Sequence, residues 1–212
     1  MNKVLALILL IALVSCNQDT ENNHSTKQSR LPIYGVKDFI PTIDKDTVYH
    51  TIPYWEFINQ DGDTVSKSDY NGKIYVANFF FSHCMGICPI LTKNIRKIQE
   101  KTEGENILFI SHTVDPKNDT TERLKWYAEK NNADLSNWNF VTGNQGEINE
   151  LGVNSYLVPS EEDVLAPGGF LHSDKFILID KLARIRGIYN GTEDAEVDKL
   201  LKDIQILKKE YE

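Results

Sequence analysis

Two cysteines, Cys84 and Cys88, have the residue type and the spacing to act together. Residues four positions apart project to one side of a helical turn, so both sulfurs can face the same point. Paired thiols can bind a soft metal ion or interconvert with a disulfide. A purely structural disulfide is the less favoured interpretation, because closing so short a loop removes little entropy from the unfolded chain.

The flanking segments predict that this pair lies at a strand-to-helix turn. The apolar run 74–81 is typical of a buried strand and leads into the turn,. A helix with apolar residues at helical spacing is predicted after it, from Cys88-Pro89 to about Lys101,. Because a helix N-terminus favours negative charge, we expect lowered pKa values for the thiols.

The rest of the chain predicts an α/β domain with a mixed sheet. A hairpin is expected to turn at Asp61-Gly62, because this dipeptide separates two runs of strand-forming residues,. Further strands are predicted at 106–111, 138–141, 175–180 and 183–189, and further helices at 119–130, 147–151 and along the apolar face formed by Val197, Leu200, Leu201, Ile204 and Leu207,. Strands and helices that alternate before a closing hairpin favour this fold class.

The N-terminal residues predict an exported lipoprotein. A short positive segment precedes the apolar run 4–14, which is shorter than the about 20 residues needed to span a bilayer,. The sequence Leu13-Val14-Ser15-Cys16 is similar to a bacterial lipobox. We therefore predict a signal peptide over 1–15, a lipidated Cys16 with a flexible spacer over 16–30, and one folded domain over 31–212. The expected location is the cell envelope, anchored in a membrane and facing outside the cytoplasm.

The net charge excludes one class of partner, and the number of cysteines indicates which of them can form a site. The chain has 31 acidic and 23 basic residues, for a net charge of -8, which excludes nucleic acid as the expected partner because phosphates need a basic surface,. Three cysteines are present, and lipidation of Cys16 leaves Cys84 and Cys88 as a single pair,.

Three sequence blocks resemble the Sco/SenC family of copper-binding proteins. The blocks are FSHCMGICP at 81–89, ISHTVDP at 110–116 and FLHS at 170–173, and the resemblance extends from about residue 50 to 209. It implies a thioredoxin-like fold in which helices flank a central mixed sheet, with a β-hairpin near the N-terminus. It also implies that copper is bound by Cys84, Cys88 and His172, and that the partner is a copper-containing subunit of a respiratory oxidase.

The chemistry of these three residues suits copper. Thiolates are soft ligands that select Cu(I), and an imidazole adds a nitrogen that also suits Cu(II). Because the ligands must be deprotonated, the affinity should fall in acid.

Other polar residues of the same blocks have open roles. His83 is next to Cys84, but the family does not use this position as a ligand, so it is interpreted as a neighbour of the site or as solvated. His112 and Asp115 lie at the end of a strand expected beside the first, where sites of such sheets gather. Asp115 is expected to orient His172 or to contact a partner; alternatively, Asp115-Pro116 only ends the strand and turns the chain.

The resemblance and the chemistry together predict a membrane-tethered copper chaperone. The resemblance alone implies that it delivers copper to cytochrome c oxidase or matures its copper centre. One alternative is a thiol-disulfide oxidoreductase, in which Cys84 and Cys88 are the catalytic redox pair that reduces cysteines of a copper-site apoprotein. A second is a redox or copper sensor. A metallochaperone is favoured over an enzyme, because the pair is spaced more widely than the usual C-x-x-C and a ligand-capable histidine precedes the later strand.

Overall fold

The computed structural model describes residues 30–35, 37–39, 47–158, 161–162, 170–171 and 173–212. The predicted signal peptide, the predicted lipidation site Cys16 and the predicted ligand His172 lie outside these residues. The elements are, in chain order, β1 (Lys37–Phe39), β2 (Thr47–Tyr49), β3 (Glu56–Asn59), β4 (Thr64–Ser66), the 3-10 helix η1 (Lys67–Tyr70), β5 (Ile74–Phe80), α1 (Cys88–Lys101), β6 (Ile107–Thr113), α2 (Thr121–Lys130), β7 (Trp138–Thr142), α3 (Gln145–Glu150), the π-helical turn η2 (Leu151–Ser155), β8 (Glu161–Glu162), β9 (Phe170–Leu171), β10 (Lys175–Ile179), β11 (Ile185–Asn190) and α4 (Asp194–Lys209).

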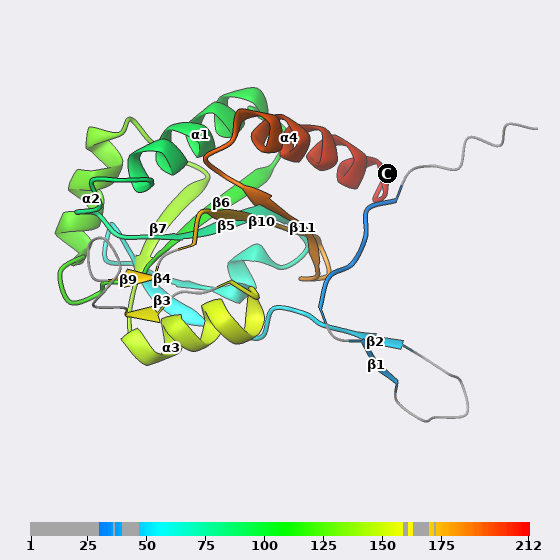
Figure 1. Ribbon diagram of the computed structural model, residues 1–212, viewed down its shortest axis with the longest axis horizontal. Helices are drawn as coiled ribbons and strands as arrows, with labels where there is room; N and C mark the ends of the chain where they lie inside the picture. The colour runs from blue at the N-terminus through cyan, green and yellow to red at the C-terminus, as the bar shows by residue number, and fades with distance from the viewer. Residues whose placement is uncertain (1–29, 36, 40–46, 159–160, 163–169, 172) are drawn as a thin grey trace, which may run out of the picture.

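Seven strands form one mixed sheet in the order β11-β10-β5-β6-β7-β3-β4 (Figure 1). The central pairs β5–β6 and β6–β7 are parallel, and the other neighbouring pairs are antiparallel. The predicted fold class, a mixed sheet flanked by helices with a hairpin near the N-terminus, is confirmed.

The strand β5 delivers the chain to the cysteine turn. Every residue of β5 is buried, as expected for a strand covered on both faces, whose sequence is then a continuous apolar run,. Its β-branched and aromatic residues suit the pleated backbone. The turn that follows therefore starts from a fixed point in the core.

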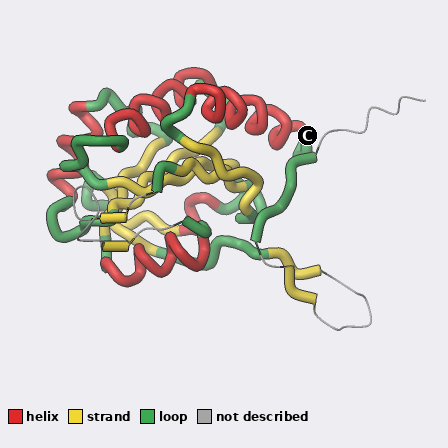
Figure 2. The backbone as a smooth tube through the Cα atoms, in the orientation of Figure 1, coloured by secondary structure: helices red, strands yellow, loops and turns green. Residues whose placement is uncertain are grey.

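Helices cover both faces of the sheet (Figures 1 and 2). The helices α1 and α4 lie together over one face, and α3 lies on the other. On α4 the predicted apolar face is buried, with Val197, Leu200, Ile204 and Leu207 in the core, whereas Leu201 is partly buried.

The helix α2 begins later than predicted. Its N-cap is Thr120, whose side chain accepts a hydrogen bond from the Arg123 amide at 3.3 Å. Asp119, which the capping pattern placed at this position, precedes the cap and turns its carboxylate into the protein. The error arose because two adjacent residues, Asp119 and Thr120, are both good caps.

The hairpin β3–β4 turns at the predicted place. Gly62 has a φ of +85°, in the left-handed region that favours glycine,. The Asn59 side chain accepts hydrogen bonds from the amides of Asp61 and Asp63, both at 2.9 Å. The small pairs β1–β2 and β8–β9 were not predicted, because strands of two or three residues are too short to show alternation,.

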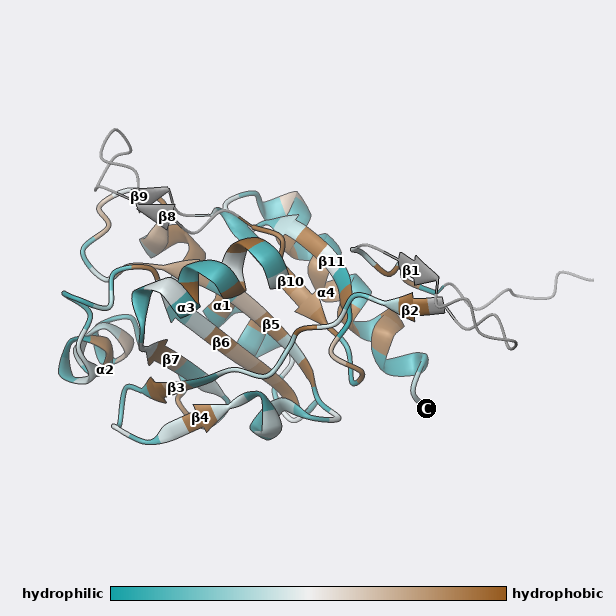
Figure 3. Ribbon diagram, turned by 90° about the horizontal axis from the view of Figure 1, so that it is seen from below, coloured by the Kyte–Doolittle hydropathy of each residue, from teal (hydrophilic) through white to brown (hydrophobic). Residues whose placement is uncertain are grey.

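The hydrophobic core is contained in the later part of the chain. The buried hydrophobic residues of the described chain all lie between Ile52 and Leu207, and Figure 3 shows hydrophobic residues concentrated in the central strands. The first described residues are tied to this core, since the Leu31 amide donates to Glu210 at 2.7 Å and Arg186 donates to the Leu31 carbonyl at 2.7 Å. A fragment from Arg30 to Glu212 thus contains the whole described core and is expected to fold on its own. Among the described residues, no helix is both long and apolar enough to cross a membrane.

Candidate metal centre

Cys84 and Cys88 lie in the turn between β5 and the first residue of α1. Cys84 is half-buried and Cys88 is fully buried, and both are thiols rather than a disulfide. The two side chains form a hydrogen bond with each other. The structure therefore brings the two sulfurs together, as their spacing predicted.

No side chain in the first turn of α1 neutralises the positive end of the helix dipole, which lies at the cysteine turn,. The N-cap residue, Ile87, makes no side-chain cap hydrogen bond, and the first turn contains no acidic residue. Pro89 in this turn has no N–H to satisfy,. An anion held by the turn would therefore meet the helix dipole without competition from a carboxylate of the same turn.

The pKa of the Cys88 thiol is raised, so the lowered value expected from the sequence is wrong for this residue. The largest cause is its hydrogen bond with Cys84, and the next is burial, which disfavours the charged thiolate,. A backbone hydrogen bond from Phe81 acts in the opposite direction. Cys88 is thus protonated at neutral pH, and a metal ion that binds its thiolate must release this proton.

A buried carboxylate, Asp119, fixes the beginning of the turn. It accepts hydrogen bonds from the Ser82 amide, at 3.0 Å, and from the hydroxyls of Ser82 and Thr113. The Ser82 hydroxyl in turn accepts from Arg123 Nε at 2.8 Å. Sequence reasoning missed this cluster, although one signal was present: hydroxyl residues end two strands that were predicted to be neighbours, and an aspartate follows the second.

We expect Asp119→Ala to lower the free energy of unfolding by about 3 kcal/mol, because it leaves buried donors of Ser82 and Thr113 without an acceptor. Asp119→Asn keeps the shape and part of the accepting capacity, so its loss should be smaller. Urea unfolding of the fragment from Arg30 measures both. Asp134→Ala, at an exposed position, is the matched control; equal losses for Asp119→Ala and this control would contradict the prediction.

Asp115 lies beside His83. Its carboxylate is buried, accepts a hydrogen bond from Asn118 at 2.8 Å, and lies 3.5 Å from His83 Nδ1. The His83 side chain is 42% exposed, so it is neither core nor fully solvated. Among the described residues Asp115 therefore contacts the neighbour of Cys84; its predicted contact with His172 lies outside them.

The strand β10 leads away from the same end of the sheet. Since β10 is antiparallel to β5, it begins where β5 passes into the cysteine turn,. Ser173, just before β10, is buried. The role of the preceding residue, His172, stays a prediction. Within the described residues, no three His, Cys, Asp or Glu side chains are grouped to hold a metal.

His112 lies in the core and not at the cysteine turn. It is fully buried, with the rings of Trp55, Phe57, Phe79 and Tyr156 centred 5.1–5.6 Å from its own. Neither ring nitrogen has a hydrogen-bond partner in the described part of the chain. Burial lowers the pKa of His112 to about 3, so its imidazole is neutral at pH 7,.

Comparison with known families identifies relatives over most of the chain. Residues 44–208 match the family model described as SCO1/SenC. The SCO1 protein homolog of Bacillus subtilis (strain 168) is 33% identical over 168 residues, which cover 76% of this chain and 84% of that protein.

The solved structures similar to this chain include three proteins of the Sco family. A SCO1/SenC family lipoprotein from Bacillus anthracis str. Ames has a TM-score of 0.69 at 30% identity, covering 75% of this chain and 95% of that one. BsSco, a member of the Sco family of cytochrome c oxidase assembly proteins in which a disulfide switch was identified, has a TM-score of 0.67 at 30% identity, covering 74% and 93%. Copper-bound ScoI of Arabidopsis thaliana has a TM-score of 0.58 at 25% identity, covering 72% and 97%.

Proposed function

Because the chain belongs to the SCO1/SenC family, we propose that it binds copper through Cys84 and Cys88 and delivers the ion to a copper-containing subunit of a cytochrome c oxidase. The observation that carries this proposal is the contact between the two thiols at the start of α1. Two similar proteins support it: Arabidopsis ScoI has a copper-bound structure, and BsSco belongs to a family of oxidase assembly proteins.

The donor chemistry of the cysteine turn fits copper. Two hydrogen-bonded thiols form a soft donor pair, and such a pair selects Cu(I),. We propose His172 as the third ligand, whose imidazole would let the site hold Cu(II) as well. The start of β10 at the mouth of the cysteine turn supports this assignment.

Holding an ion for transfer requires that it can also leave. Cys84 is half-buried, so one sulfur is accessible from outside while Cys88 is enclosed. The raised pKa of Cys88 means that protons compete with copper around neutral pH,. The affinity should therefore rise with pH as the thiol proton is lost more easily.

The proposal is tested by metal analysis of the reduced fragment from Arg30 to Glu212. We expect one copper per chain after desalting, with sulfur-to-copper charge-transfer absorption for Cu(II). Alkylation of both thiols before copper is added should abolish retention. If the alkylated protein retains as much copper as the untreated protein, the thiols are not the ligands.

A second candidate function is thiol-disulfide exchange with a copper-site apoprotein. The hydrogen bond between the thiols favours it, because two neighbouring thiols can close to a disulfide while they reduce the disulfide of a partner,. The disulfide switch described for BsSco gives it further support. Reduction of a disulfide-containing oxidase fragment in copper-free buffer separates this function from copper delivery.

We further propose that the protein is anchored by lipid on Cys16 and faces outside the cytoplasm. The lipobox-like sequence carries this proposal, and the Bacillus anthracis relative is described as a lipoprotein. Cys16→Ser should move the protein from the membrane fraction to the soluble fraction of cells, because a protein without acyl chains loses about 0.8 kcal/mol per buried methylene. An unchanged distribution after this substitution would argue against the anchor.

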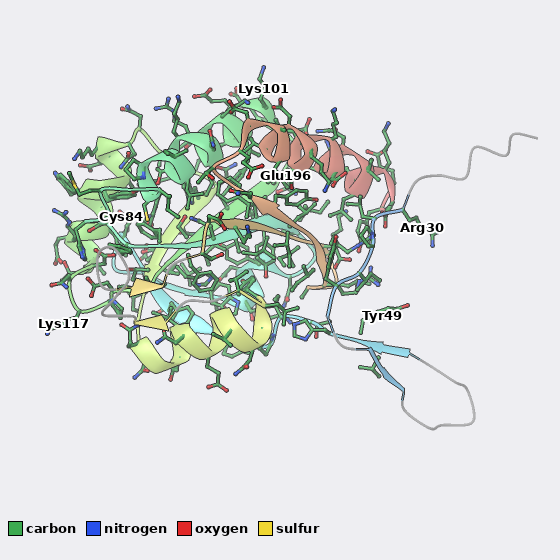
Figure 4. The ribbon with its side chains drawn as sticks, viewed as in Figure 1. Arg30, Tyr49, Cys84, Lys101, Lys117 and Glu196 are labelled. Carbon is green, nitrogen blue, oxygen red and sulfur yellow. The ribbon has the colours of Figure 1, made fainter. Side chains whose placement is uncertain are left out.

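The shape of the domain suits such an anchor. Figure 4 shows Arg30 and Cys84 at opposite ends of the long axis of the molecule. If residues 17–29 are the spacer that the sequence predicts, they would span on average about 20 Å. A membrane attached at Cys16 would therefore be joined to the end of the domain opposite the cysteine turn.

A further inference from the structure

Met85 adds a third sulfur to the cysteine turn. It lies between Cys84 and Cys88 in sequence, and its side chain is 96% exposed, the highest value among the large hydrophobic residues of the described chain. The chain has two methionines, Met1 and Met85, so Met85 carries the only thioether of residues 31–212.

The position of Met85 distinguishes it from other exposed apolar residues. A single exposed apolar side chain is ordinary on a protein surface and indicates nothing by itself. Met85, however, follows directly after Cys84, whose thiol contacts that of Cys88. The next residue is Gly86, at which a Cβ would lie 3.9 Å from Cys84 Sγ. Since glycine has no side chain, residue 86 places nothing over this sulfur.

The chemistry of a thioether matches one oxidation state of copper. It is a soft, uncharged donor, and soft donors select Cu(I). A methionine side chain is unbranched, with several rotatable bonds, so it can swing between solvent and a neighbouring ion. It binds without losing a proton, in contrast to a thiol.

We propose that Met85 Sδ is a further ligand of Cu(I), which binds the ion on its solvent side while the cysteine pair holds it. This inference rests on the proposed function of Cys84 and Cys88. Copper remains Cu(I) throughout, so the step is an exchange of ligands and no electron moves. Cu(II) prefers nitrogen and oxygen donors, so its binding should depend little on Met85.

The test uses selenomethionine as a direct probe of the bond. The reduced fragment from Arg30 to Glu212 is labelled with selenomethionine, loaded with Cu(I) without oxygen, and measured by selenium X-ray absorption. Met85→Leu keeps an apolar side chain of similar size at position 85 but has no sulfur that could bind copper. Any selenium signal that remains in this variant comes from the initiator methionine of the fragment. Ile90→Ala removes another exposed apolar side chain near the turn and controls for a surface effect.

We expect a copper–selenium contact in the wild-type fragment and none in Met85→Leu. Competition with a Cu(I) chelator should show a loss of about tenfold in affinity for Met85→Leu, the lower end of the effect of a residue that supports a metal site. The Cu(II) affinity of Met85→Leu and the Cu(I) affinity of Ile90→Ala should both equal those of the wild-type fragment. If the fragment binds Cu(I) but shows no copper–selenium contact and Met85→Leu binds equally well, this inference is wrong and the proposed function stands. If the wild-type fragment retains no Cu(I), the proposed function fails, and this inference fails with it.

Discussion

Replacing Cys84 and Cys88 together by serine is expected to weaken Cu(I) binding by about four orders of magnitude. Sites with four thiolate or imidazole ligands bind zinc with about 10–16 kcal/mol, which is roughly 3 kcal/mol for each ligand. A loss of 1.4 kcal/mol is tenfold in affinity, so each thiolate accounts for about a hundredfold. A serine hydroxyl is a hard donor and does not replace a thiolate for Cu(I). Chelator competition on the reduced fragment measures the change.

The single variants keep this prediction testable if the double variant is unstable. Cys88 is fully buried, so a serine there places a hydroxyl in the core, whereas Cys84 is half-buried and its replacement disturbs little,. Cys84→Ser should therefore lose about a hundredfold in affinity at nearly the wild-type free energy of unfolding. His172→Ala should also abolish tight binding but leave the Cys84–Cys88 disulfide able to form. Wild-type Cu(I) affinity in Cys84→Ser would show that copper binds elsewhere.

Local patterns in the sequence were sufficient to predict most of the central sheet. The continuous apolar run at β5 and the helical spacing of α1 are properties of short segments, so the strand-to-helix turn and its two thiols were predictable. The fold class followed from the order of these elements and from the family resemblance.

The sequence did not reveal properties that depend on contacts between distant segments. The protonated state of Cys88 results from burial and from its contact with Cys84, and both outweigh the helix N-terminus that suggested a lowered pKa,. Asp119 looked like a helix cap because its partners, Ser82 and Thr113, come from the ends of two other segments. Both features are visible only once β5, β6 and α2 are packed together.

The sequence motif that contains His112 also did not reveal where its side chain lies. The block ISHTVDP places it three residues before Asp115, close to the predicted site in sequence. In the structure its side chain lies among the rings of Phe57, Phe79 and Tyr156, which come from other segments. A histidine in a motif was thus part of the core, where it is not placed to be a copper ligand and is expected to affect the stability of the fold.

His112→Phe is expected to remove much of the acid sensitivity of the fold. In the folded chain burial lowers the pKa of His112 from 6.5 to about 3, so between these values the unfolded chain binds a proton that the folded chain does not. The contribution of neutral His112 to the free energy of unfolding is therefore fully present above pH 6.5 and is lost as the pH falls toward 3. Between pH 7 and pH 5 the loss amounts to about 2 kcal/mol of unfolding free energy. Urea unfolding at both pH values should show this loss in the wild-type fragment and not in His112→Phe.

A second variant separates the charge of His112 from its packing. His112→Ala leaves a cavity among the surrounding rings, so it should be less stable than wild type at pH 7. Between pH 7 and pH 5, however, it should not show the loss of about 2 kcal/mol in unfolding free energy that protonation of His112 causes in wild type. If wild type, His112→Phe and His112→Ala lose equal stability between pH 7 and pH 5, His112 is not the titrating group. Because Phe79, in the strand that leads to the cysteine turn, stacks on His112, protonation of the imidazole would disturb the support of that turn. Copper release in acid would then have two causes, unfolding and protonation of the thiolates, and release that persists in His112→Phe at pH 5 measures the second alone.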